Sequence, residues 1–289
     1  MIDFSIIVPS YGKPESLGKL LVSVAGLKYS GSGYEVVIVD DGSPTPLSSV
    51  VFPFRDRINL TLIEQRNMGP AFARNRGAAV GQGRCLAFID DDCLAEPEWL
   101  ESLAGVLGES NRLVCGGRTV NGLPDNIYSE ASQLLLEYLS DYYSPTTTYG
   151  AFFPSNNLAL SKTAFQRAGG FDPSFRFGED RDFCLRCASL GFSFVQVPKA
   201  VVYHRHPQTL LSFIRLHSCY GSGTYALRRG CAAKGLPPVR ISPPSWYMNL
   251  ILAGMRKTKS PKGAALSLLL LVSQAAEIAG MLRGRLTRP

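Results

Sequence analysis

The sequence predicts an α/β fold, and three short apolar runs in the first half of the chain are the main reason. Phe4–Val8, Tyr34–Val39 and Cys85–Ile89 are rich in strand-forming residues and are separated by segments of helical length. Continuous apolar runs of this kind are typical of parallel strands that are covered on both faces. The composition, with 45% hydrophobic and 18% charged residues among 289, is that of a globular chain able to bury a full core.

The segments between these runs carry helix signals. Apolar residues recur at helical spacing between Glu15 and Leu27, and Pro70 and Pro97 stand where a proline at the first position of a helix costs no hydrogen bond. The expected elements in chain order are a strand at 58–63, helices at 70–80, 98–107 and 126–139, a strand at 157–160, a helix at 179–190, strands at 194–197 and 200–203, and a largely helical segment beyond Pro207.

Acidic residues come directly after two of the expected strands. Asp40 and Asp41 follow the second apolar run, and Asp90, Asp91 and Asp92 follow the third. In open parallel sheets, ligands bind beyond the carboxyl ends of the strands. We therefore expect both acidic groups to line one crevice.

Three consecutive aspartates repel one another, and this repulsion weakens the fold unless a cation is close. Carboxylate oxygens are hard ligands that favour Mg²⁺ or Mn²⁺, which also bind the phosphates of substrates. The triplet therefore predicts a divalent metal site. The alternative interpretation is an acidic loop that caps the helix at Pro97, although capping needs only one such side chain.

Seven motifs occur together and in order, and as a set they resemble the family 2 glycosyltransferases of GT-A fold. The resemblance covers roughly residues 3–206 and is more specific than any single motif. The motifs are Ser5-Ile6-Ile7-Val8-Pro9-Ser10-Tyr11, Val37-Ile38-Val39-Asp40-Asp41-Gly42-Ser43, Asn67-x-Gly69, Ala73-Arg74-Asn75-x-Gly77, Phe88-Ile89-Asp90-Asp91-Asp92, Gly169-Gly170-Phe171-Asp172 and Phe177-Gly178-Glu179-Asp180-x-Asp182-Phe183.

The resemblance implies a binding site for a nucleotide-diphosphate sugar. Asp41 resembles the carboxylate that accepts a hydrogen bond from the base of the donor, and Pro9 and Tyr11 resemble the residues that enclose this base. Arg74 resembles a residue beside the donor pocket, for which the alternative is a surface salt bridge.

The resemblance also implies a metal site at the triplet. Asp90 and Asp92 resemble the Asp-x-Asp pair of the family, with Asp90 on the donor and Asp92 on the metal, while Asp91 is left as a supporting or surface carboxylate. His204 resembles a histidine that reaches the metal or the diphosphate, and its alternative is a surface histidine.

Asp180 is our candidate for the general base that removes the proton of the acceptor hydroxyl. Helical spacing places it on the same face as Phe183 and Cys184, so that it is expected to point inward. The alternative is that Glu179 and Asp180 merely stabilise the N-terminus of a helix. Glu179 and Asn157 are assigned to the acceptor side. The spacing of Asp182 and Arg186 predicts an ion pair on the outward face of the helix.

Absent motifs exclude several classes of enzyme. The sequence contains no phosphate-binding loop of the Gly-x-x-x-x-Gly-Lys-Ser/Thr type, no Gly-x-Gly-x-x-Gly turn after the first strand and no Gly-x-Ser-x-Gly elbow. The Gln-x-x-Arg-Trp motif of processive family members is also missing, which favours the addition of single sugars. The resemblance implies inversion at the anomeric carbon. Two alternatives remain open, namely a sugar-nucleotide-forming nucleotidyltransferase and a non-catalytic protein that binds nucleotide sugars or glycans.

The C-terminal part of the chain is basic. Residues 205–289 contain thirteen Lys and Arg and one acid, whereas the whole chain has a formal net charge of +7. Such asymmetry indicates an anionic partner, and a membrane surface fits better than nucleic acid because no nucleic-acid-binding motif is visible. The apolar stretch 264–282 fits a helix that lies in the membrane interface, packs on the protein or spans the bilayer.

These patterns together predict the organisation of the chain. We expect a GT-A catalytic domain at 1–206, with a nucleotide-sugar-binding half at 1–117 and an acceptor half at 118–206, followed by a basic helical region at 207–289. The expected acceptor is a hydroxyl-bearing glycan or a lipid-linked acceptor. Because no targeting leader is visible at the N-terminus, a cytoplasmic location at the inner face of the cell membrane is expected.

Overall fold

A computed structural model describes residues 2–144 and 152–286 of the protein. These residues form two compact units. The first unit takes its residues from 1–122 and 150–205, and the second from 123–149 and 206–289. Within the expected acceptor half at 118–206, the described residues 123–144 group with the C-terminal helices.

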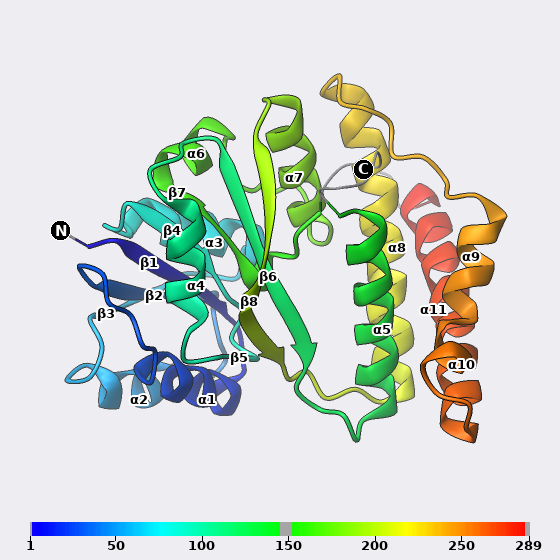
Figure 1. Cartoon of the computed structure of the whole chain (residues 1–289), viewed down its shortest axis with the longest axis horizontal. Helices are drawn as coiled ribbons and strands as arrows, with labels where there is room; N and C mark the ends of the chain where they lie inside the picture. The colour runs from blue at the N-terminus through cyan, green and yellow to red at the C-terminus, as the bar shows by residue number, and fades with distance from the viewer. Residues whose placement is uncertain (1, 145–151, 287–289) are drawn as a thin grey trace. The chain divides into compact units, whose positions relative to one another are not determined.

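The first unit is built on one mixed sheet, in which we find eight strands within the described residues (Figure 1). The strands lie in the order β3-β2-β1-β4-β7-β6-β8-β5, and only β7 and β5 run opposite to the others. The strands are β1 Phe4–Ser10, β2 Tyr34–Asp40, β3 Leu60–Glu64, β4 Cys85–Phe88, β5 Cys93–Ala95, β6 Leu113–Asn121, β7 Leu158–Ser161 and β8 Ser193–His204. The predicted α/β class is confirmed.

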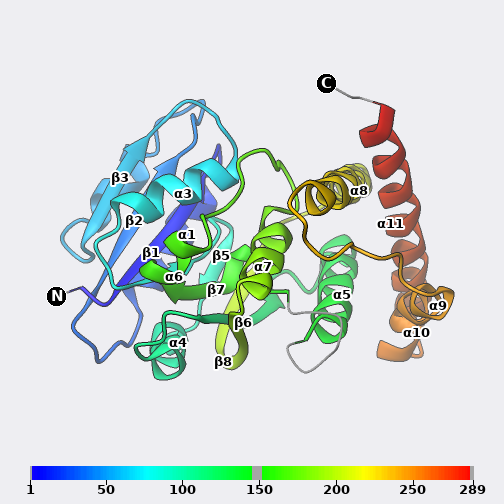
Figure 2. The ribbon, with the colours of Figure 1, turned by 90° about the horizontal axis from the view of Figure 1, so that it is seen from above.

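Side chains of the buried strands alternate between two cores, one on each face of the sheet. In β1, Phe4, Ile6 and Val8 enter one core, and Ile7 enters the other, as the two-residue period of a strand requires. The first core includes side chains of α1 and α4, and the second includes those of α3, α6 and α7. Figure 2 shows α3 and α4 on opposite sides of the sheet. The helices of this unit are α1 Pro14–Ala25, α2 Ser48–Val51, α3 Pro70–Val80, α4 Trp99–Leu107, α6 Lys162–Arg167 and α7 Glu179–Ser189.

Two strands, β5 and β6, are not predicted by the sequence, and two predicted strands form one continuous strand. β5 has only three residues, and β6 contains Gly116 and Gly117, which weaken the strand signal. The predicted strands at 194–197 and 200–203 form the single strand β8, whose pairing with β6 shifts register between Gly117 and Arg118. At this irregularity the pairing passes from Gly117 with Val197 to Arg118 with Val201, and the strand continues on both sides of it.

The second unit consists of helices, namely α5 Ile127–Tyr142, α8 Leu210–Ala233, α9 Pro244–Ile251, α10 Ala253–Lys257 and α11 Pro261–Leu286. α8 and α11 pack closely along their length (Figure 1). A Cβ atom on Gly221 would overlap the backbone of Glu277, and one on Gly280 would overlap the backbone of Ser218. The two glycines therefore allow the helices to approach each other.

α11 is the one helix in the described part of the chain that is long and apolar enough to cross a membrane by length and composition. Its most apolar window is 44% buried within the structure. Leu266 and Leu270 are fully buried, whereas Leu268 and Ile278 are about 60% exposed. One face of this helix therefore packs on the second unit and another carries exposed apolar side chains.

Candidate active site

The order of the strands places a topological switch point at the carboxyl end of β1. β1 pairs with β2 on one side and with β4 on the other. The strand order reverses at this place, and ligands bind at such switch points in open α/β sheets. Ser10 pairs with Asp40 in register, and the backbone N–H of Asp41 donates to the carbonyl of Ser10 at 2.8 Å. The acidic groups after β2 and β4 thus lie at the same edge, as expected.

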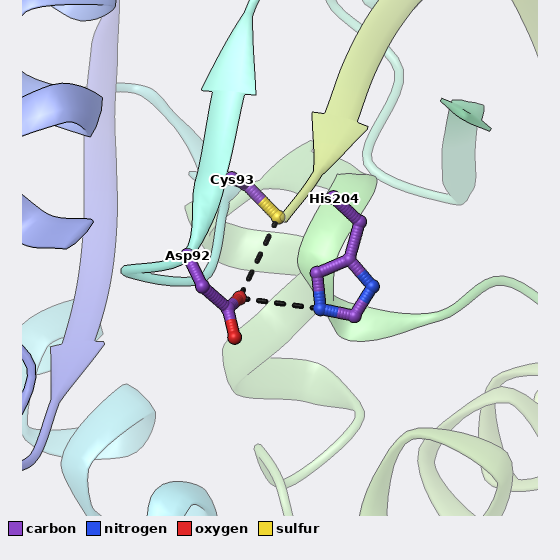
Figure 3. A group of neighbouring side chains, drawn as sticks. All are labelled: Asp92, Cys93 and His204. Carbon is purple, nitrogen blue, oxygen red and sulfur yellow. Dashed lines mark hydrogen bonds and ion pairs between the residues drawn. The ribbon is translucent and has the colours of Figure 1, made fainter. Parts of the chain in front are cut away.

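Asp92 and His204 face each other across the strand pair β5 and β8 (Figure 3). The register pairs Cys93 with His204, and the Oδ1 atom of Asp92 lies 3.2 Å from the Nε2 atom of His204. Burial alone would raise the pKa of Asp92, but the hydrogen bond and charge of His204, together with Lys13, hold this pKa well below its usual range. Burial opposes the charged form of His204, yet Asp92 raises the pKa of the imidazole above its ordinary value.

The chemistry and spacing of these two side chains fit a divalent cation. Ligands at neighbouring positions of an octahedral ion with bonds of about 2.1 Å are separated by about 3 Å, close to the observed oxygen–nitrogen distance. The Sγ atom of Cys93 is near, at 4.0 Å from Oδ1 of Asp92. Burial raises the pKa of this thiol, so that it stays protonated, and hard ions prefer oxygen and imidazole ligands. Asp92 and His204 therefore form the candidate metal site.

Asp91 is a buried partner of the loop that follows β1, not a surface carboxylate. Its Oδ2 atom accepts from the Ser10 hydroxyl at 2.8 Å, and its Oδ1 atom lies 3.4 Å from the Nζ atom of Lys13. Burial raises the pKa of Asp91 to about 6, with Lys13 opposing this rise. Lys13 also contacts Oδ2 of Asp92 at 2.8 Å. The sequence does not predict a role for Lys13 in this cluster. Its only local signal is its place directly after the turn that follows the first strand.

Arg74 lies in the protein interior between two carboxylates. Its guanidinium contacts Oδ1 of Asp90 at 2.6 Å and Oε1 of Glu179 at 2.8 Å, and the residue is 4% exposed. The alternative of a surface salt bridge is therefore wrong. The bridge joins the strand end at Asp90 to the N-terminus of α7, which lie far apart in the sequence.

Two further sets of hydrogen bonds hold the turn between α6 and α7. The side-chain amide of Asn75 donates to the carbonyl of Phe171 at 2.6 Å and accepts from its N–H at 2.9 Å. The guanidinium of Arg186 donates to the carbonyls of Ala168 and Gly170. It also contacts Asp182 at 2.7 Å, and Asp182 is completely buried. The expectation that Asp182 and Arg186 form an outward-facing pair is wrong. Arg186 points toward the turn, where Asp182 supplies its counter-charge.

Asp180 sits in the first turn of α7 next to Glu179. Its Oδ1 atom accepts from the N–H of Arg181 at 2.8 Å, and its Oδ2 atom accepts from the N–H of Ser155 at 3.4 Å. Burial raises the pKa of Asp180 to about 7, the charge of Glu179 adds to the rise, and Arg74 opposes it. A carboxyl group with such a pKa exchanges protons near neutral pH. Although poorly solvated, the side chain keeps a partly exposed surface.

Asp41 fixes the loop that follows β3. Its Oδ1 atom accepts from the side chain of Gln65 at 2.7 Å and from the N–H of Met68 at 2.8 Å, while Oδ2 accepts from the N–H of Gly69 at 2.8 Å. Each carboxylate oxygen has two lone pairs, so Oδ2 retains acceptor capacity for a ligand. Tyr11 is 51% exposed at the same edge of the sheet, after Pro9. Half-exposed aromatic rings of this kind offer a stacking surface.

Asn157, assigned from the sequence to the acceptor side, lies in the core of the first unit. The residue is completely buried, its Oδ1 atom accepts from the indole N–H of Trp99 at 2.9 Å, and its amide donates to the carbonyl of Ala200 at 3.0 Å. Both ends of the amide are thus used inside the core, where they connect α4 to β8. Glu179 is also buried and directs Oε1 to Arg74.

Comparisons with known proteins agree with these features. A family model described as Glycosyl transferase family 2 matches residues 5–169. The chain is 29% identical over 230 residues to the pre-mycofactocin glycosyltransferase of Mycobacterium tuberculosis, covering 78% of this chain and 47% of that protein. It is 25% identical over 238 residues to chondroitin synthase of Escherichia coli, covering 70% of this chain and 34% of that protein. The chain thus spans about half or less of the length of these relatives.

Solved structures resemble the protein along its whole length. The mannosyltransferase PcManGT from Pyrobaculum calidifontis, in complex with GDP-Man and Mn²⁺, has a TM-score of 0.72 and 16% identity, covering 99% of this chain and 88% of that chain. TarS 1-349 of S. aureus in complex with UDP-GlcNAc has a TM-score of 0.56 and 19% identity, covering 99% and 91%. Both are GT-A proteins, and the predicted GT-A fold is confirmed.

The buried Arg74 bridge generates a prediction about stability. We expect Arg74→Met to lower the free energy of unfolding by about 3–5 kcal/mol, because it leaves two carboxylates without a counter-charge. Denaturant unfolding measures this change. Arg76→Met is the matched control on the exposed side of α3, where we expect a change within about 0.5 kcal/mol. Replacing Glu179 by Met in the Arg74→Met background should recover part of the loss. Equal effects of Arg74→Met and Arg76→Met would contradict the bridge.

Proposed function

Because the chain belongs to glycosyl transferase family 2, we propose that it transfers a sugar from a nucleotide-diphosphate sugar to a hydroxyl group, with inversion at the anomeric carbon. The Arg74 bridge is the observation that carries this proposal. It joins Asp90, at the candidate donor site, to the helix that bears Asp180, the candidate base. Inversion in one displacement needs a donor and a base in one site, and this bridge holds the two parts of the chain together.

The donor occupies the crevice beyond β1 in this proposal. Pro9 and Tyr11 enclose the base, Oδ2 of Asp41 accepts a hydrogen bond from it, and Asp90 contacts the ribose or the sugar. The complexes of PcManGT with GDP-Man and of TarS with UDP-GlcNAc support a nucleotide sugar as the class of donor. Arg74 lies beside the donor in this proposal and supports the donor site through its contact with Asp90.

Asp92 and His204 hold a divalent cation, Mg²⁺ or Mn²⁺. The oxygen–nitrogen distance of 3.2 Å and the Mn²⁺ in the PcManGT complex support this assignment. A bound cation would stabilise the negative charge that builds up on the departing diphosphate. Asp91 and Ser10 keep the neighbouring backbone in place by their hydrogen bond of 2.8 Å.

Asp180 acts as the general base. It takes the proton of the acceptor hydroxyl while the acceptor oxygen forms its bond to the anomeric carbon and the bond to the nucleoside diphosphate breaks. A pKa of about 7 keeps a large fraction of this carboxyl ionised near neutral pH, yet leaves it basic enough to bind a proton. Glu179 contributes through its charge, since it raises the pKa of Asp180, and through its hold on Arg74.

The second unit brings the enzyme to an anionic membrane surface, where lipid-linked or cell-surface glycans are the acceptors. Leu268, Leu271, Ile278 and Leu282 are exposed on α11, and Lys262, Arg283 and Arg285 stand at its two ends. An apolar stripe with basic ends suits a helix that lies in the plane of a membrane interface. The protein is then peripheral at the inner face of the cell membrane. In this scheme, residues 1–206 provide catalysis, with 1–117 for the donor and 118–206 for the acceptor, while 207–289 provide attachment.

The role of Asp180 is testable by its pH dependence. We expect kcat/KM to fall about tenfold per pH unit below an apparent pKa near 7, because protonation of Asp180 removes the base. Asp180→Asn should lower kcat by about 10² to 10⁴ and remove this part of the pH profile. Glu179→Gln is a comparison variant that keeps Asp180 and should move the apparent pKa downward. Retained activity in Asp180→Asn would exclude Asp180 as the base.

The fold of Asp180→Asn is checked by its thermal stability at two pH values. The pKa of Asp180 is raised from 3.8 to about 7 in the folded protein, so the folded state binds a proton between these values and loses stability as the pH rises through them. Asn carries no charge to desolvate. We therefore expect Asp180→Asn to raise the midpoint of thermal unfolding at pH 8 and to leave it nearly unchanged below pH 4.

The donor and the metal are testable by a thermal-shift screen. We expect one of the UDP-, GDP- or dTDP-sugars to stabilise the protein in the presence of Mn²⁺ and much less after chelation, because Asp92 would hold an ion that favours the binding of a diphosphate. Asp92→Asn should abolish the dependence on Mn²⁺. Turnover should release free nucleoside diphosphate, whereas release of pyrophosphate would show a nucleotidyltransferase instead. Binding of sugar nucleotides without any turnover of acceptors would favour a non-catalytic binding protein.

Membrane binding is testable with vesicles and point variants that preserve the packed face of α11. We expect the protein to sediment with vesicles that contain phosphatidylglycerol and much less with phosphatidylcholine alone. Leu271→Gln combined with Ile278→Gln should weaken sedimentation, because both exposed side chains would leave the acyl boundary. Val22→Gln combined with Val80→Gln, two exposed positions of the first unit, is the control. Indifference to phosphatidylglycerol would contradict the membrane role.

A further inference from the structure

Lys13 places a positive charge directly on the acidic cluster. It is the residue before α1, so the short turn after β1 fixes its backbone. Its Nζ atom lies 2.8 Å from Oδ2 of Asp92 and 3.4 Å from Oδ1 of Asp91. The two carboxylates are 8% and 7% exposed, whereas the lysine side chain is 49% exposed. The ammonium group therefore reaches buried carboxylates from the solvent side.

The two oxygens of Asp92 have different partners. Oδ1 faces His204 at 3.2 Å, and Oδ2 is the atom that Lys13 contacts. A cation that binds Asp92 and His204 would come within a few ångströms of the ammonium group. Two positive charges at such a distance repel each other strongly, even at the effective dielectric constant of a protein surface.

We propose that Lys13 is a built-in counter-ion that competes with the divalent cation for Asp92, so that the metal binds tightly only together with the diphosphate of the donor. The proposal rests on the proposed function, in which Asp92 is a metal ligand. Lys13 thus acts on the reaction through Asp92, because it couples the binding of the metal to the binding of the donor.

The chemistry of lysine suits this role. A lysine carries its charge on a flexible four-carbon stem, so the ammonium group leaves one anion for another without movement of the backbone. A diphosphate supplies oxygens both to the metal and to a displaced ammonium group. When it is present, the repulsion between Lys13 and the cation is offset by new contacts on each side.

The other two basic side chains of the cluster lack this freedom. Arg74 is 4% exposed and is held by both Asp90 and Glu179. His204 extends from β8 and is 20% exposed. Only Lys13, among these three, combines a contact to the candidate metal ligand with a side chain that is half in solvent. The coupling between metal and diphosphate is therefore assigned to this residue.

Binding of Mn²⁺ measured by electron paramagnetic resonance tests the proposal without any turnover. Mn²⁺ alone should bind the wild-type chain weakly, and Lys13→Met should bind it about tenfold more tightly or better, which is within the usual range of coupling between two sites. Lys13→Arg keeps the charge and should stay close to the wild type. Lys19→Met is the matched control, because Lys19 lies on α1, the helix that Lys13 precedes, and pairs only with the exposed Glu15 among the ion pairs of the described chain.

UDP and GDP provide the second arm of the experiment. Whichever nucleotide binds should tighten the binding of Mn²⁺ to the wild-type chain by a larger factor than it does for Lys13→Met, because the variant has no ammonium group to displace. Circular dichroism checks that the variants are folded, and Lys13→Gln replaces Lys13→Met if the latter is not.

The outcomes separate this inference from the proposed function. If Asp92→Asn abolishes the binding of Mn²⁺ while Lys13→Met binds it no more tightly than the wild type, the counter-ion role of Lys13 is overturned and the metal site stands. If Asp92→Asn binds Mn²⁺ like the wild type, the metal site of the proposed function is wrong, and the inference fails with it.

Discussion

The ion pairs of Arg74 with Asp90 and Glu179 are the interaction on which the rest of the site depends. A buried guanidinium is costly to desolvate, and it is tolerated when counter-charges lie against it. Asp90 and Glu179 supply two such charges from sequence segments that are 89 residues apart. Any arrangement that separates α7 from the end of β4 would leave Arg74 without one partner. The bridge thereby specifies where α7 begins, and with it the place of Asp180.

The same electrostatics explain why two adjacent carboxylates of α7 have different roles. Glu179 shares the positive charge of Arg74 directly, at 2.8 Å. Asp180 lies one residue further and has no cation in contact among the described ion pairs, so that burial and the negative charge of Glu179 dominate and its pKa rises to about 7. Neighbouring acids whose environments separate their proton affinities are the arrangement that acid–base catalysis requires. Glu179 holds Arg74, and Asp180 accepts protons.

The sequence predicts the sheet and the acidic cluster well because both depend on local patterns. Apolar runs of strand length and the acids that follow them are visible without any tertiary information. β6 was missed because Gly116 and Gly117 suggest a loop, yet tertiary packing requires them, since a Cβ atom on either would overlap Phe153 or Asn157. Lys13 was missed for a related reason. Its partners are 78 and 79 residues away, and a single lysine after a turn gives no local sign of what its side chain reaches.

The acidic cluster is best understood as three carboxylates with three basic side chains of unequal exposure. Arg74 is fixed inside the protein and neutralises Asp90, His204 extends from a strand toward one oxygen of Asp92, and Lys13 covers the other oxygen from solvent. Because opposite charges are available within the chain, the triplet does not by itself require a metal for stability, although the sequence alone suggested that it would. The distinguishing feature of the site is instead a lysine that is half exposed to solvent and contacts two buried carboxylates. A lysine that can leave Asp92 converts a stable ion-pair cluster into a site that exchanges its counter-charge when a diphosphate arrives.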